Sequence, residues 1–228
     1  MNRLPHFARS DSALRRAVAT GFSALALSAC SALSPTATPA TAFFALDGAP
    51  KPAVAATWAM PAAALATKTL LINPPYATAG FDSTRIVYLR QPHKLDYYAL
   101  SQWVDPPARM LGPLLVAAIE KTGAVRAVVL MPAAAAGDLR LDTQIIRLQQ
   151  DFQTQPSRVR LTLRATLLDD RTRQVLAWQE FDAVEPAISE DAYGGVLAAN
   201  RAVQTVVDEL ARFVAAKAIA SKTVPATP

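Results

Sequence analysis

Apolar and polar residues alternate most regularly between Arg158 and Leu168. A period of two places alternate side chains on opposite faces, so this segment predicts a β-strand with one buried and one solvated face. Antiparallel sheets commonly have such a solvated face. Residues 169–173 predict a hairpin turn, and residues 174–183 predict the returning strand. The side chains expected to face the core are Val159, Leu161, Leu163, Ala165 and Leu167.

Shorter apolar runs predict further strands before and after a first helix. These runs cover residues 42–46, 68–72, 85–90, 94–100, 125–131 and 139–148. In the last run the alternation shifts by one position near Ile145 and Ile146, which predicts a β-bulge. Residues 49–66 are rich in alanine and proline and predict a loop, whereas residues 76–82 predict a connector.

Two helices are predicted from apolar residues at spacings of three, four and seven. The first covers Asp105–Lys121, with Asp105 as the N-cap, Pro106 in the first turn and Gly123 at the end. Pro113 predicts a kink or a later start, because proline cannot donate to the carbonyl of the residue four positions earlier. The second helix covers residues 189–220.

These elements predict an α+β fold, a single domain in which a mostly antiparallel sheet packs against two main helices. The domain would span residues 42–220, and residues 221–228 would form a flexible tail. Asn200 lies among alanines on the second helix, which predicts close helix packing and a hydrogen bond from Asn200 to a neighbouring backbone group.

The first 29 residues have the features of a secretory signal peptide. Four arginines (Arg3, Arg9, Arg15 and Arg16) precede an apolar run of small residues that ends at Ala29. The sequence Leu27-Ser28-Ala29-Cys30 also resembles the bacterial lipobox, in which the cysteine is acylated and becomes the new N-terminus. Cys30 is therefore the predicted lipidation site, where a fatty acid such as palmitate would be attached.

Other interpretations of this segment differ in what they require. A transmembrane helix over residues 17–29 would rise only about 20 Å, whereas a bilayer core is about 30 Å thick. An ordinary signal peptide cut elsewhere would leave Cys30 as a free thiol. A buried helix of a cytoplasmic protein is disfavoured by residues 31–41, which contain Ser, Ala, Thr and Pro with one Leu. Such a segment orders itself poorly, so residues 30–41 predict a lipidated tether.

The residue after the cysteine bears on the destination of the protein. Ser31 occupies the position at which an Asp retains enteric bacterial lipoproteins in the inner membrane. A serine here in place of the aspartate indicates that the protein is located at the periplasmic face of the outer membrane, although retention in the inner membrane stays open.

Charge and composition exclude several classes of function. The net charge is +5, but residues 1–29 contain four arginines and one aspartate, so the mature chain has 19 basic and 17 acidic residues. This balance provides no basic patch for nucleic acid. The single cysteine excludes an intramolecular disulfide. His6 and His93 are too few for a histidine metal site, and we expect neither a metal nor a cofactor.

The sequence contains no convincing catalytic constellation. Ser101, Ser157 and Ser189 have no histidine partner in view, since His93 alone remains after export and follows a proline. A Ser-His-Asp triad is therefore disfavoured. Asp142 and Asp151 flank a predicted strand and could be a carboxylate pair, but solvated edge charges are the simpler interpretation.

Three segments in the centre of the chain carry a family resemblance. They are Arg85-Ile86-Val87-Tyr88, Leu95-Asp96-Tyr97-Tyr98-Ala99 and residues 103–111 (WVDPPARML). Residues 139–142, 150–152 and 198–202 follow in the same order, so the similarity extends from about Phe43 to Phe213. The chain resembles the ABC-type transport auxiliary lipoprotein family, to which the small lipoprotein accompanying the paraquat-inducible MCE proteins belongs.

This resemblance implies a non-enzymatic outer-membrane lipoprotein of an ABC/MCE-type intermembrane lipid transport system. Its partners would be a periplasmic MCE-domain conduit, which it docks at the outer membrane, and the inner-membrane permease. Members of the family look like ring-forming oligomers, so the resemblance also implies a homo-oligomer. The alternatives are a periplasmic hydrolase such as an esterase, and a structural envelope lipoprotein without a role in lipid traffic.

The aromatic and basic residues between positions 85 and 109 allow three interpretations. The aromatic side chains could fill the core while the arginines lie on the wet face of the sheet. They could instead contact a partner or another subunit, because interfaces favour Tyr, Trp and Arg. A site for lipid headgroups is the third interpretation. The candidate contact residues are Arg85, Tyr88, Tyr97, Tyr98, Trp103 and Arg109.

Overall fold

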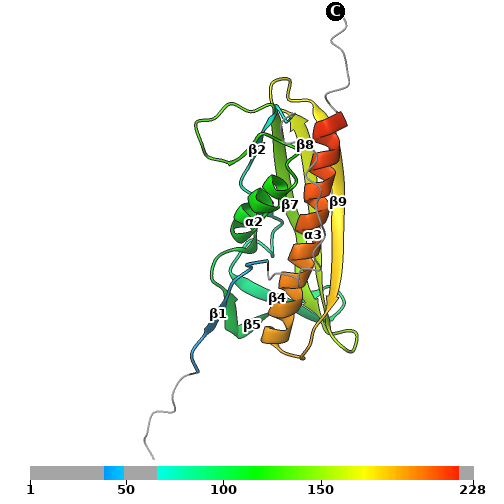
Figure 1. Ribbon diagram of the computed structural model, residues 1–228. Coiled ribbons are helices and arrows are strands. Elements are labelled where there is room, and N and C mark those ends of the chain that lie inside the picture. The colour runs from blue at the N-terminus through cyan, green and yellow to red at the C-terminus, as the bar shows by residue number, and fades with distance from the viewer. Residues whose placement is uncertain (1–38, 49–65, 221–228) are drawn as a thin grey trace, which may run out of the picture. The chain divides into compact units, whose positions relative to one another are not determined.

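The computed structural model describes residues 39–48 and 66–220 (Figure 1). The predicted signal peptide, Cys30, nearly all of the tether, the loop at 49–65 and the tail lie outside the described residues. The described elements belong to one compact unit. The strands are β1 (Ala42–Phe44), β2 (Thr69–Ile72), β3 (Tyr76–Ala77), β4 (Arg85–Gln91), β5 (Lys94–Trp103), β6 (Ala127–Leu130), β7 (Leu139–Asp151), β8 (Arg158–Asp169) and β9 (Val175–Pro186), and the helices are α2 (Pro107–Lys121) and α3 (Ala192–Ala220).

The long strands form an antiparallel meander in the order β7, β8, β9, and β4 pairs antiparallel with β5. The α+β class, the single domain and the mostly antiparallel sheet are therefore confirmed. The short strands pair in parallel: β1 with β5, β2 with both β6 and β7, and β3 with β7. β4 also pairs in parallel with β7. The sequence did not indicate these parallel pairings, because periodicity specifies the faces of a strand and not its neighbours.

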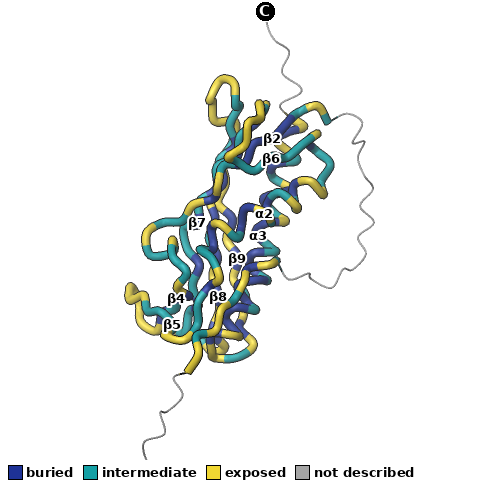
Figure 2. The backbone as a smooth tube through the Cα atoms, turned by 90° about the vertical axis from the view of Figure 1, so that its left-hand side faces the viewer, coloured by how far each residue is buried: buried dark blue, intermediate teal, exposed yellow. Residues whose placement is uncertain are grey.

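The core lies between one face of the sheet and the buried sides of both helices, and α3 covers the inner face of β8 and β9. The five predicted inward side chains of β8 are each at most 2% exposed. Phe181 of β9 meets Phe213 of α3 edge to face, with ring centroids 5.8 Å apart. Figure 2 shows buried residues, in dark blue, along this contact between helix and sheet. Burial of each large apolar side chain contributes about 1.5–3 kcal/mol before conformational entropy is subtracted.

The start of α2 differs from the prediction. Pro106 is the N-cap and no side chain caps the helix. Asp105 instead forms an ion pair with Arg109, with 3.2 Å between the oxygen and nitrogen. The later start does not occur, since the helix begins at Pro107 and continues through Pro113. The end is as predicted, with Gly123 at φ +63° after the C-cap residue.

The bulge expected in β7 is confirmed, because the register with β8 shifts between Ile145 and Arg147. Most other predicted strands agree with the structure to within about three residues at each end. The connector at 76–82 contains the two-residue strand β3. None of the described helices is long and apolar enough to span a membrane.

Asn200 ties the N-terminal segment of the domain to α3. Its Oδ1 accepts hydrogen bonds from the backbone amides of Asp47 (3.0 Å) and Gly48 (3.2 Å). Its Nδ2 donates to the carbonyls of Ala45 (3.1 Å) and Val196 (3.2 Å). The predicted hydrogen bond from Asn200 to a neighbouring backbone is confirmed, and it fixes the segment after β1 against the helix.

Candidate functional site

The six candidate contact residues separate into different environments. Trp103 is 3% exposed and belongs to the core, so the structural interpretation applies to it. Arg109 is exposed on the first turn of α2, where it pairs with Asp105. The other four lie on the β4–β5 pair, in two groups on opposite faces.

Three rings and a guanidinium gather on one face of β4, β5 and the end of β7, and we name Tyr88, Arg90, Tyr98 and Phe152 the Tyr88 cluster. The ring centroids of Tyr88 and Tyr98 are 4.7 Å apart, and those of Tyr88 and Phe152 are 5.8 Å apart. The Arg90 guanidinium carbon lies 4.9 Å from the Phe152 ring and 5.6 Å from the Tyr88 ring. Rings and guanidinium attract one another in these arrangements.

The parallel pairing of β4 with β7 assembles this cluster. Tyr88 is the register partner of Gln150, which places Phe152 beside Tyr88 although 64 residues separate them. Phe152 belongs to the family pattern in the sequence, but nothing in the sequence places it with Tyr88. Spacing along the chain contains no signal for such a long-range contact.

A chain of buried and partly buried hydrogen bonds supports the cluster on its inner side. The Tyr98 hydroxyl donates to Gln150 Oε1 at 2.9 Å, and Gln150 Nε2 donates to Ser157 Oγ at 2.9 Å. The Ser157 backbone amide donates to Glu190 Oε1 at 2.9 Å. Burial raises the pKa of Tyr98 well above its ordinary value, so the hydroxyl keeps its proton and acts as a donor.

Gly195 of α3 lets the helix approach this network closely. A Cβ at this position would overlap the side-chain amide of Gln150. Gln150 is 2% exposed and is therefore held between the sheet and α3. The helix thus limits where the Gln150 amide, which accepts the hydrogen bond from Tyr98, can lie.

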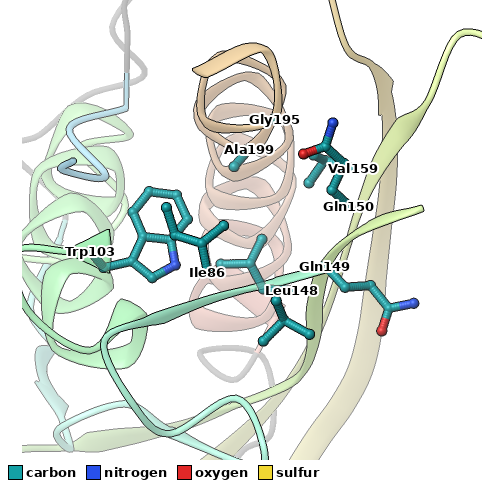
Figure 3. Close-up of a pocket in the computed structure, with 9 residues that line it drawn as sticks. Ile86, Trp103, Leu148, Gln149, Gln150, Val159, Gly195 and Ala199 are labelled. Carbon is teal, nitrogen blue, oxygen red and sulfur yellow. The ribbon is translucent and has the colours of Figure 1, made fainter. Parts of the chain in front are cut away.

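A small cavity lies beside Gln150. It is lined mainly by Ile86, Trp103, Leu148, Val159 and Ala199 (Figure 3), and its volume is about 10 Å³. This volume is about that of one water-sized probe and far below the several hundred Å³ of sites for small molecules. The cavity therefore cannot accommodate a lipid chain.

The opposite face of β4 and β5 carries the second group. The Arg85 guanidinium carbon lies 4.4 Å from the centre of the Tyr97 ring. Arg85 is exposed and Tyr97 is half-buried. The arginine is thus available to an anion while the ring fixes its position.

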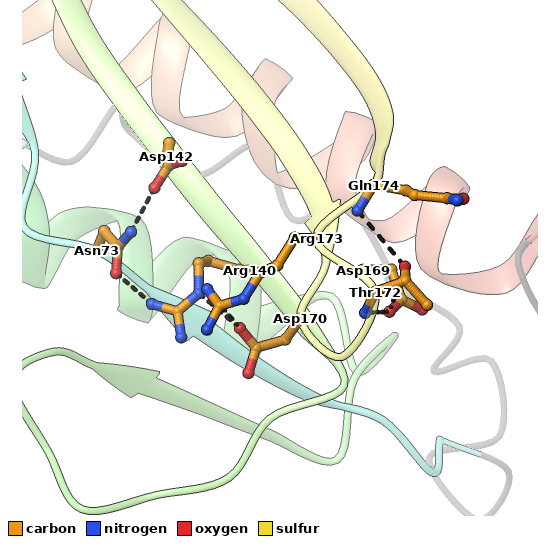
Figure 4. A network of polar contacts seen from close by, with 8 residues as sticks. All are labelled: Asn73, Arg140, Asp142, Asp169, Asp170, Thr172, Arg173 and Gln174. Atoms are coloured by element: carbon orange, nitrogen blue, oxygen red, sulfur yellow. Dashed lines mark hydrogen bonds and ion pairs between the residues drawn. The ribbon is translucent and has the colours of Figure 1, made fainter.

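A polar network closes the end of the sheet at the β8–β9 turn (Figure 4). Arg140 pairs with Asp170 at 2.6 Å and donates to Asn73 Oδ1 at 2.7 Å. Asn73 Nδ2 in turn donates to Asp142 Oδ1 at 2.5 Å. Hydrogen bonds from Thr172 lower the pKa of Asp169 in the turn. These contacts hold β2, β7 and the turn together.

The remaining residues considered for chemistry have structural surroundings. Asp142 and Asp151 are nine residues apart on one strand, about 30 Å, so they do not form a carboxylate pair. His93 is exposed at the β4–β5 turn with φ 65°. Ser157 and Ser189 are hydrogen-bonded to Gln150 and Asp191. Within residues 39–48 and 66–220, no three His, Cys, Asp or Glu side chains are grouped to hold a metal ion.

Comparison with known proteins gives a family and a fold. A family model described as the ABC-type transport auxiliary lipoprotein component matches residues 44–211. The crystal structure of protein XCC0632 from Xanthomonas campestris, which carries the family label DUF330, is 26% identical with a TM-score of 0.64. The match covers 69% of this chain and 89% of that chain. The crystal structure of an uncharacterised protein is 12% identical with a TM-score of 0.57, covering 77% and 99%. No curated protein matches the chain.

Proposed function

Because the chain belongs to the family of ABC-type transport auxiliary lipoprotein components, we propose that it is the outer-membrane lipoprotein of an ABC/MCE-type intermembrane lipid transport system. In this role Cys30 carries the lipid anchor after removal of the signal peptide. The folded domain docks a periplasmic MCE-domain conduit at the outer membrane, and the inner-membrane permease completes the system. The observation that carries the proposal is the family match, which spans the domain from Phe44 to Ala211.

The family description supports a non-enzymatic protein held in the cell envelope. A docking protein needs a surface that is already ordered before its partner arrives, because ordering side chains on binding lowers affinity. The Tyr88 cluster meets this requirement. Arg90 is exposed, and Tyr98 is held by the buried amide of Gln150.

We therefore assign the contact with the conduit to Tyr88, Arg90, Tyr98 and Phe152. Tyrosine and arginine are the residue types that contribute most to protein interfaces. Arg109, exposed on α2, is a second candidate contact. A homo-oligomer would use the same types of residue, so the experiment must distinguish a conduit contact from a subunit contact.

The test of the anchor is metabolic labelling with a palmitate analogue. The wild-type protein and a His93→Ala control should take up the label, and Cys30→Ala should not. An unlabelled wild-type protein, or unchanged labelling of Cys30→Ala, would refute the anchor.

The test of docking is photo-crosslinking in intact cells. A crosslinking amino acid at position 90 should capture the MCE-domain protein, whereas one at Arg164, exposed on the wet face of β8, should not. Capture of a second copy at position 90 would make the cluster a subunit interface. Absence of any MCE-domain crosslink from both positions would reject the docking role.

Loss of function provides an independent measurement. Deletion of the gene should increase sensitivity to detergents, and Arg90→Ala should reproduce part of that sensitivity. Arg164→Ala is the matched control, because it also removes one exposed arginine and should leave sensitivity unchanged.

A further inference from the structure

One face of β1, β5 and β4 carries a row of exposed apolar and basic side chains. Phe43 is the register partner of Gln102, and Gln102 is the register partner of Arg85. Register partners on adjacent strands lie on the same face. The register of β4 with β5 shifts by an odd number of residues between Arg85 and Val87, which places Tyr97, and not Tyr98, on the side of Gln102. Val104 directly follows β5. We name Phe43, Arg85, Tyr97, Gln102 and Val104 the β1 face.

The apolar members of the β1 face are well exposed. Phe43 is 63% exposed and Val104 is 56% exposed. They are neighbours through the backbone, because the Val104 amide donates to the carbonyl of Phe44 at 2.8 Å. Next to them the Arg85 guanidinium lies over the Tyr97 ring. Apolar side chains flanked by an aromatic ring and a cation are typical of surfaces that lie at the boundary of a bilayer.

Isolated exposed apolar residues are common on protein surfaces and need no special explanation. The position of these residues in the chain distinguishes them. Phe43 follows Cys30 by 13 residues, and a fully extended segment of that length spans at most about 45 Å. A lipid on Cys30 would therefore keep the β1 face close to the membrane surface at high effective concentration.

We propose that the β1 face contacts the phospholipid surface of the membrane in which Cys30 is anchored. Phe43 and Val104 enter the boundary between headgroups and acyl chains, and Arg85, supported by Tyr97, faces the lipid phosphates. This inference rests on the lipid anchor of the proposed function. The contact orients the domain, because the Tyr88 cluster lies on the opposite face of β4 and β5 and is directed away from the bilayer.

The test uses the full-length acylated protein in vesicles of phosphatidylethanolamine and phosphatidylglycerol. Cys30 is the only cysteine of the sequence, and acylation blocks its thiol, so an introduced cysteine can be labelled selectively. Phe43→Cys and Val104→Cys receive an environment-sensitive dye. Val184→Cys is the matched control, because Val184 is 45% exposed on β9.

The dye at positions 43 and 104 should show blue-shifted emission and lose emission when the lipids carry brominated acyl chains. The dye at position 184 should be unaffected. Equal, unquenched emission at all three positions in protein that sediments with the vesicles would overturn the inference and leave the anchor intact. Protein that fails to sediment with the vesicles would refute the anchor itself, and the inference with it.

A charge variant tests the contribution of Arg85. Raising the fraction of phosphatidylglycerol should increase quenching at position 104, and Arg85→Gln should abolish that increase. Arg164→Gln, which removes an exposed arginine from the wet face of β8, should preserve it. An equal response in both variants would contradict a phosphate contact at Arg85. If positions 43 and 104 crosslink to a protein and the dye there is not quenched by brominated lipids, the bilayer contact is also refuted.

Discussion

Gly195→Ala tests whether α3 rests directly on the buried amide of Gln150. The three atoms nearest to the new Cβ are Oε1, Cδ and Nε2 of Gln150, so the methyl group overlaps this side-chain amide. Either the amide must move or the helix must shift. Movement of the amide breaks its hydrogen bonds with Tyr98 and Ser157.

The magnitude follows from these alternatives. A lost hydrogen bond costs about 0.5–1.5 kcal/mol, and a buried polar group left without a partner costs about 1–3 kcal/mol. Overpacking by a shifted helix costs a similar amount, about 1–3 kcal/mol. Alanine in place of glycine within a helix stabilises the helix by about 1 kcal/mol, which offsets part of this cost. The cheaper alternative decides the cost, so we expect Gly195→Ala to lower the free energy of unfolding by about 1–2 kcal/mol.

Gly112→Ala is the matched control. Gly112 is also a buried helical glycine, but a Cβ there would lie 3.4 Å from the end of the flexible Leu130 side chain. This variant should be neutral or more stable by up to about 1 kcal/mol. Urea denaturation followed by circular dichroism measures the unfolding free energies of both variants. The comparison is valid when the dependence of that free energy on urea concentration is the same in each.

A double-mutant cycle makes the reasoning refutable. In a Gln150→Ala background the overlap disappears, so Gly195→Ala should cost nothing or stabilise. A coupling energy of at least about 1 kcal/mol is expected for residues in direct contact. Equal effects of Gly195→Ala in both backgrounds, or equal stabilities of Gly195→Ala and Gly112→Ala, would show that the amide does not hold the helix.

Three further predictions concern stability. Thr143→Val should stabilise the protein by about 1 kcal/mol in urea denaturation. The reason is that the Thr143 hydroxyl is buried without a hydrogen-bond partner among the described residues. Destabilisation by this substitution would contradict an unsatisfied hydroxyl. Arg140→Ala should lower the free energy of unfolding by about 2–4 kcal/mol, since it leaves Asp170, whose side chain is 14% exposed, without its main partner. Arg164→Ala, which breaks an exposed ion pair, should lower it by less than about 1 kcal/mol. The hydrogen bond from Arg160 lowers the pKa of Asp182 in the folded protein. The ionised carboxylate therefore stabilises the fold fully above its unfolded pKa near 4. This stabilisation is lost as the pH falls through the lower pKa of the folded state. Asp182→Asn should therefore flatten the loss of stability measured below about pH 4.

Strands that are buried on one face and solvated on the other were predicted best from the sequence. β8 is buried on one side only, so its period of two is undisturbed, and the bulge in β7 is visible as a break in that period. Asn200 was also interpretable, because an amide among alanines on a buried helix face must find backbone partners.

The failures at the start of α2 have a local cause. Asp105 is a favourable N-cap by residue type, but its carboxylate pairs with Arg109, and Pro106 takes the N-cap position. Propensity describes what a residue can do, whereas neighbouring charges decide between two local interactions of similar free energy.

The candidate contact residues show where sequence becomes insufficient. Their types indicated either core packing or an interface, and the fold decided residue by residue. Trp103 is buried, Tyr88 joins Phe152 and Arg90 on one face of the sheet, and Arg85 lies over Tyr97 on the opposite face. None of these outcomes follows from the spacing of the residues.

The elements, the faces of the long strands, the family resemblance and the lipidation motif could be recognised without a structure, because each of them consists of patterns among residues close together in the chain. Which strands are neighbours is known only from the folded structure. The parallel pairing of β4 with β7 brings Tyr88 to Gln150 and Phe152, and the pairing of β1 with β5 aligns Phe43 with Gln102 and Arg85. Such pairings are selected by the packing of the whole core, so no local pattern of residues encodes them.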